Sequence, residues 1–123
     1  MLTKQEQDYF NKIVEDIKNK LCIDIPILSC NHEILKGHEE ALGIAYSYDK
    51  ADVYQITIDE YFIHECYYDF LWNQGYRDRG IVPKVEIKSL EDVICHEIAH
   101  ITYWNHGKKH RELTDKLLIK LCA

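Results

Sequence analysis

Residues 89–100 read SLEDVICHEIAH, and this stretch predicts a capped amphipathic helix. Ser89 with Asp92 three positions later forms a variant of the capping box that starts helices. Apolar residues recur at helical spacing, namely Leu90, Val93, Ile94, Ile98 and Ile101. The predicted helix therefore has a buried face, and its histidines lie beside that face.

The same helix carries the pattern H-E-x-x-H at residues 96–100. The i,i+4 spacing places His96 and His100 on one helical face, so both imidazoles can bind one metal ion. Glu97 follows His96 and can reach a water molecule in an open metal position. We expect two metal ligands and a catalytic base here. The alternative is an ordinary amphipathic helix with two surface or core histidines.

His106 is the candidate third metal ligand. On an unbroken helix it would be turned about 240° from the second motif histidine and would point away from the metal. We therefore expect the helix to end at Tyr103 or Trp104. Asn105 tolerates a left-handed conformation, and Gly107 relieves the turn further.

Three further residues remain open as the third ligand. His106 could simply begin the next helix, and the ligand could instead be His110, Glu112 or Asp115. Glu112 is close in sequence for a glutamate ligand, which usually comes from a separate helix further along. Each of these possibilities keeps the two motif histidines.

Residues 93–110, VICHEIAHITYWNHGKKH, resemble the core of the small SprT-like, WLM and YgjP-type metallopeptidases. The spacing to the third histidine is similar to that of the WLM and YgjP types. The resemblance implies a minimal zincin-like fold, Zn²⁺ held by His96, His100 and His106, and Glu97 as the base. Two features depart from it. His110 stands where those families have Phe or Trp, and residues 1–123 contain no zinc ribbon.

The resemblance also implies a function, a zinc-dependent metallopeptidase. Zinc-activated water would hydrolyse peptide bonds of a protein or peptide substrate, with Glu97 as general base. DNA-associated proteins are substrates of related families, and the strand 53–59 would align the substrate. The alternatives are a non-enzymatic zinc-containing binding or regulatory module and a hydrolase of small amides. Metzincins need a methionine in a turn below the metal, the Met-turn, and the only methionine of this sequence is Met1, so that class is excluded.

Length and charge constrain the class. The chain has 123 residues, enough for one domain spanning 1–123, and 46% of them are hydrophobic. The net charge of -6 gives no support for DNA association and argues against an anionic membrane surface. The five cysteines contain no C-x-x-C pair, and no apolar stretch has the length of a membrane span. We expect a cytoplasmic protein without disulfides, of unknown oligomeric state.

The remaining elements predict an α+β fold with an N-terminal helix to about residue 21. Three strands of a mostly antiparallel sheet follow at 25–29, 41–47 and 53–59, with a hairpin turn at 48–52. A final helix is expected at 107–122. The aromatic segment 60–80 suggests a helix to about 73 and an exposed loop at 75–80. Its aromatic residues favour core and rim positions over a substrate-binding wall.

Overall fold

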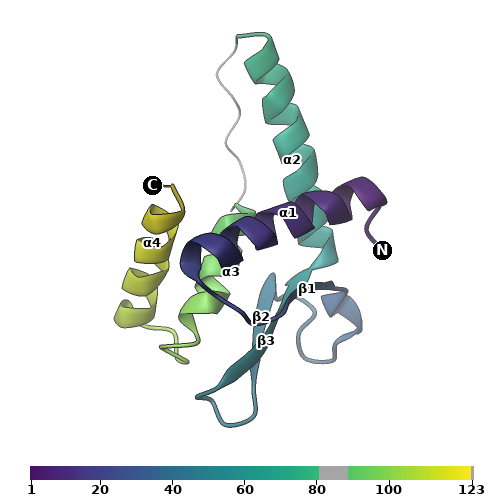
Figure 1. Cartoon of the computed structure of the whole chain (residues 1–123). Coiled ribbons are helices and arrows are strands. Elements are labelled where there is room, and N and C mark those ends of the chain that lie inside the picture. Colours follow the sequence, from purple (N-terminus) through teal and green to yellow (C-terminus); the bar gives the residue numbers. More distant parts are fainter. Residues whose placement is uncertain (81–88, 123) are drawn as a thin grey trace.

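The computed structural model describes residues 1–80 and 89–122, which form an α+β fold (Figure 1). The elements in chain order are α1 (Lys4–Leu21), β1 (Ile27–Cys30), the 3₁₀ helix η1 (His32–Ile34), β2 (Gly43–Ser47), β3 (Val53–Asp59), α2 (Glu60–Asp78), α3 (Leu90–Ala99) and α4 (Lys108–Cys122). The predicted N-terminal helix, three-stranded sheet, motif helix and C-terminal helix are confirmed.

The three strands form one mixed sheet in the order β1-β3-β2. β3 pairs antiparallel with β2 and, over residues 56–59, in parallel with β1, so it is the central strand. The expectation that strand 53–59 aligns the substrate is therefore wrong, because a central strand has no free hydrogen-bonding edge. Among the strands described, β2 offers a free edge next to α3, against which it packs.

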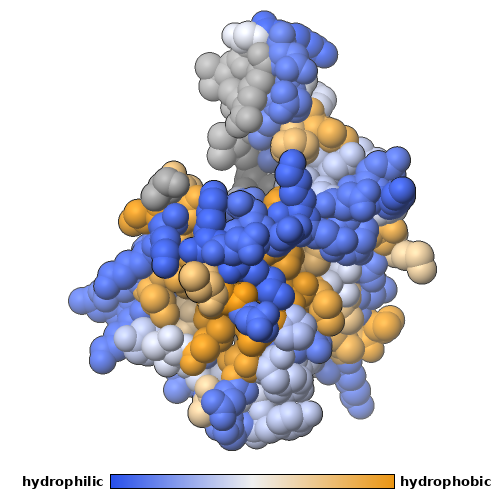
Figure 2. All heavy atoms as spheres, in the orientation of Figure 1, coloured by the Kyte–Doolittle hydropathy of each residue, from blue (hydrophilic) through white to orange (hydrophobic). Residues whose placement is uncertain are grey.

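The core lies between the helices and one face of the sheet. Ile56 and Ile58 of β3 are fully buried and pack with Ile63 of α2, Ile94 of α3 and Phe10 of α1. The outer side of α1 forms a hydrophilic band in Figure 2, and hydrophobic residues are visible below it toward the sheet. α3 is thus held from several sides, which fixes the position of its histidines.

The aromatic segment forms a longer helix than expected. α2 continues to Asp78, so most of the predicted loop at 75–80 is helical. Gly75 inside the helix costs about 1 kcal/mol relative to Ala, which does not end it. The chain leaves the helix at Gly80, whose φ of 73° is the left-handed conformation that commonly follows a helix. Among the described residues, no helix combines the length and apolar character needed to cross a bilayer.

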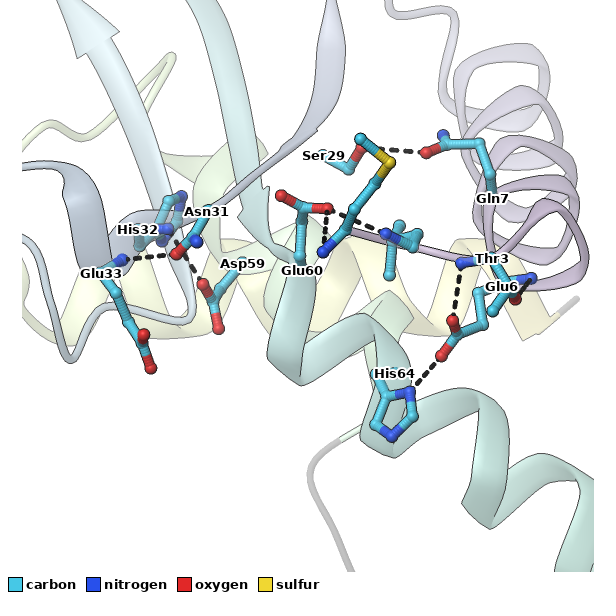
Figure 3. A network of polar contacts seen from close by, with 12 residues as sticks. Thr3, Glu6, Gln7, Ser29, Asn31, His32, Glu33, Asp59, Glu60 and His64 are labelled. Carbon is cyan, nitrogen blue, oxygen red and sulfur yellow. Dashed lines mark hydrogen bonds and ion pairs between the residues drawn. The ribbon is translucent and has the colours of Figure 1, made fainter.

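A buried carboxylate joins the start of α1 to α2 (Figure 3). The Thr3 backbone N–H donates to Glu6 Oε1 at 2.8 Å, and the Glu6 N–H donates to Thr3 Oγ1 at 3.2 Å, completing a capping box. The second Glu6 carboxylate oxygen accepts a hydrogen bond from His64 Nδ1 on α2. His64 therefore has a structural role in joining α1 and α2, and it is not part of the histidine motif.

This network predicts a pH dependence of stability. The hydrogen bond from the Thr3 backbone, with a smaller contribution from His64, lowers the pKa of Glu6 below its ordinary 4.5, although burial opposes the shift. A carboxylate whose pKa is lower in the folded state than in the unfolded state stabilises the fold when the pH is above the unfolded-state pKa. This stabilisation is lost as the pH falls through the folded-state pKa. We expect Glu6→Gln to destabilise the protein at pH 7, and we expect this difference to shrink as pH falls below 4.5 and through the lowered pKa of Glu6.

The measurement is the free energy of unfolding of wild type and Glu6→Gln from denaturant titrations at pH 7 and pH 3.5. Gln at this position retains a capping-box acceptor, so the cap itself survives. Glu15→Gln, an exposed change on the same helix, is the matched control. A Glu6→Gln effect that is equal at both pH values would contradict the prediction.

Candidate metal centre

The motif helix begins as predicted and ends earlier. Ser89 Oγ accepts a hydrogen bond from the Asp92 N–H at 3.1 Å, which caps α3. The helix ends at Ala99, before the expected Tyr103 or Trp104, and the N–H groups of Thr102 and Tyr103 both donate to the Ala99 carbonyl. The chain therefore turns away immediately after the second motif histidine, which is the C-cap residue.

The turn does not use the left-handed residues that were expected. In the described part of the chain, positive φ angles occur at Cys22, Lys50, Gly37 and Gly80, and neither Asn105 nor Gly107 is among them. Instead, the N–H groups of residues 100–102 each donate to the carbonyl three positions earlier, and these tight turns change the direction of the chain. The prediction that the helix must end before His106 is confirmed, and the proposed mechanism for ending it is wrong.

The turn brings His106 back to the motif. His106 Nε2 lies 3.1 Å from His96 Nε2, and the ring centroids of His106 and His100 are 4.8 Å apart. Two imidazole ligands of a tetrahedral zinc with bonds of about 2.05 Å place their nitrogens about 3.3 Å apart. The separation of the two Nε2 atoms is thus suitable for two ligands of one ion.

His100 is held in an orientation suited to a metal ligand. Its Nδ1 donates to the Tyr103 carbonyl at 3.2 Å, which leaves the lone pair on Nε2. Burial and the neighbouring His110 and His106 lower the pKa of His100, although the carbonyls of Tyr103 and Trp104 oppose the shift. The neutral imidazole, which is the form that binds metals, is therefore favoured.

His110 joins the same cluster from α4. It is 3% exposed, and its Nε2 donates to the His96 carbonyl at 2.9 Å. His96, His100 and His110 offer ligand atoms within 4.8 Å of one another, close enough to hold a metal ion. The two candidate carboxylates face solvent instead: Asp115 is exposed, and Glu112 is exposed and pairs with Lys108 at 3.9 Å.

Glu97 lies between the histidines and the sheet. The residue is 4% exposed, and its Oε1 is 3.8 Å from His100 Nε2. Its side chain packs on Gly43 of β2 so closely that a Cβ at Gly43 would lie 2.8 Å from Glu97 Cγ. The absence of a side chain at residue 43 therefore makes room for the carboxylate.

A cleft of about 530 Å³ opens beside these residues. Its lining includes His96, Glu97, His100, Trp104, His106 and Gly43. No residue of α2 appears among its described lining residues, so the aromatic side chains that the structure describes on that helix do not form its wall. The cleft is the place where a substrate would meet both the histidines and the carboxylate.

The free edge of β2 borders this cleft. The Asp59 N–H donates to the Leu42 carbonyl, which makes that pair a hydrogen-bonded pair of the antiparallel ladder. Hydrogen-bonded and non-hydrogen-bonded pairs alternate along such a ladder, so the backbone N–H and C=O groups of Gly43 and Ala45 point away from β3. Both residues line the cleft, so a substrate strand could pair there.

The chain matches no protein-family model, no curated protein and no solved structure at a significant level. The candidate site therefore depends on the residues themselves. From the sequence, the cluster was expected to comprise His96, Glu97, His100 and His106, and the structure brings these four together. Sequence analysis missed Gly43, and it named His110 only as a substitute for His106. No local pattern signals either position, because their partners are distant in sequence.

Proposed function

We propose that this protein is a zinc-dependent metallopeptidase that hydrolyses peptide bonds in its central cleft. The observation that carries the proposal is the convergence of motif histidines and a buried carboxylate on one cleft bordered by a free strand edge. Such a concave site with a few polar groups is the usual form of an active site. The two motif histidines and His106 are the assigned ligands.

The donor set fits zinc. Zinc prefers imidazole nitrogen and thiolate, and three protein ligands with an open position are typical of its catalytic sites. All five cysteines are free, and Cys95 beside the motif is fully buried in the core, so the donors here are imidazoles. When bound, zinc would act as a Lewis acid toward the scissile carbonyl and would lower the pKa of its bound water toward about 7.

Glu97 is the proposed proton carrier. Its Oε1 lies 3.8 Å from the nitrogen of His100 that is left free for a metal, so the carboxylate borders the reacting centre. A carboxylate in this position accepts a proton from the attacking water and returns it to the leaving amine. Its burial against Gly43 limits its motion and keeps it aimed at the cleft.

The substrate is proposed to bind as an added strand. The outward N–H and C=O groups of Gly43 and Ala45 would pair with an extended peptide, as in recognition by β-augmentation. This mode reads the backbone and therefore favours an unfolded or extended protein segment. An action on DNA-associated proteins has only the family resemblance in its favour, because the net charge is -6.

The test is cleavage of a denatured protein before and after metal removal. We expect a chelator to abolish cleavage, and about one equivalent of Zn²⁺ per chain to restore it, because the Lewis acid is essential to the proposed chemistry. Circular dichroism before and after chelation would show that the fold persists. Cleavage that continues in metal-free protein would overturn the proposal.

A further inference from the structure

The site contains one more imidazole than a catalytic zinc needs. We propose that His110 is a fourth metal ligand. In the resting protein four imidazoles would then hold the metal, and His106 would be the ligand that is displaced to open a position for hydrolysis. This inference rests on the proposed function. It adds that the resting site is inactive until one of its ligands is displaced. The resemblance does not provide it, because the related families have an aromatic residue where this chain has His110.

The hydrogen bond of His110 decides which of its nitrogens is available. A carbonyl oxygen can only accept, so the Nε2 that faces the His96 carbonyl carries the proton. In the neutral ring the lone pair is then on Nδ1, which makes no hydrogen bond within residues 1–80 and 89–122. A metal ligand whose second ring nitrogen donates to a carbonyl is the usual arrangement in metalloproteins.

The position of the ring is consistent with ligation. Its centroid is 4.2 Å from that of His100 and 4.5 Å from that of His96, and the three residues offer ligand atoms within 4.8 Å of one another. Four nitrogens around one tetrahedral zinc would lie about 3.3 Å apart, so the ligand atoms of these three residues would have to approach one another by at most about 1.5 Å.

The two additional histidines differ in their freedom to move. His110 is buried on α4 and anchored to the His96 carbonyl, whereas His106 is exposed on the turn between α3 and α4. A site closed by four protein ligands is typical of structural zinc, and hydrolysis needs an open position. His106 is the ligand that can leave to provide it, because it lies exposed on the turn and no hydrogen bond to a backbone carbonyl is recorded for its ring in the described part of the chain.

The experiment compares zinc binding in wild type, His106→Ala, His110→Gln and the double variant, by competition with a chromogenic chelator. Each single variant retains three imidazoles, so we expect it to bind about one zinc per chain. Its zinc affinity should fall by about 100-fold or more, which exceeds the usual effect of removing only a hydrogen-bond partner of a metal ligand. The double variant retains two, and we expect it to lose stoichiometric zinc. His64→Gln, outside the site, is the matched control.

Gln at residue 110 separates ligation from mere positioning. Its amide N–H can still donate to the His96 carbonyl, but it lacks the imidazole lone pair. Wild-type zinc affinity in His110→Gln would overturn the inference, and so would complete loss of zinc in His106→Ala alone. Circular dichroism checks that each variant is folded. If wild type binds zinc in the expected pattern yet cleaves nothing, the proposed function fails and the ligand assignment survives.

Discussion

Replacing Glu97 with Gln is expected to reduce cleavage of a denatured protein by about 10²–10⁴-fold while zinc content stays at the wild-type level. Gln has nearly the same shape, so it should keep the close packing on Gly43. It cannot accept the proton of the attacking water at neutral pH, and general-base catalysis is lost. The measurement combines a cleavage assay with metal analysis of the same preparations.

Glu112→Gln is the matched control for this variant. It makes the same chemical change on α4, where Glu112 is exposed and pairs with Lys108. Since exposed ion pairs contribute little, its activity and stability should resemble those of wild type. Unchanged cleavage by Glu97→Gln would sink the assigned mechanism. A wild-type protein that binds zinc but shows no cleavage would favour a non-enzymatic binding module.

Gly43→Ala should displace the Glu97 carboxylate, because residue 43 of β2 packs directly against the Glu97 side chain. The added Cβ would lie 2.8 Å from Glu97 Cγ and 3.0 Å from Val93 Cγ1, so these side chains must move. Overpacking of this kind typically costs about 1–3 kcal/mol of stability. A displacement of about 1 Å at a catalytic group can cost about 10²-fold in rate. We therefore expect a large loss of activity with a moderate loss of stability.

The measurements are the cleavage rate and the free energy of unfolding of the folded variant. Gly75→Ala is the matched control, because a Cβ there would meet no atom within 4 Å and Ala is favourable inside a helix. It should be as active as wild type and equally or slightly more stable. Full activity in folded Gly43→Ala would show that the carboxylate does not depend on its contact with β2.

The local features of this chain were predictable because they depend on residues a few positions apart. The capping residues Thr3 and Ser89 start helices by bonding to N–H groups three positions along, and the motif histidines share a helical face through i,i+4 spacing. The extended structure of strand 53–59 followed equally from local alternation. The sequence by itself thus determined the order and type of the elements and the shared helical face of the two motif histidines, but not where α2 and α3 end.

Tertiary structure decided which strand lies at the edge of the sheet and which side chains complete the site. Strand 53–59 is central because β1 and β2 pair on its two sides, and local alternation is the same for central and edge strands. Gly43 meets Glu97, and His110 meets His96, only after β2 and α4 pack against α3. Contacts between separate elements depend on how the whole core packs, so no local pattern in the sequence specifies them.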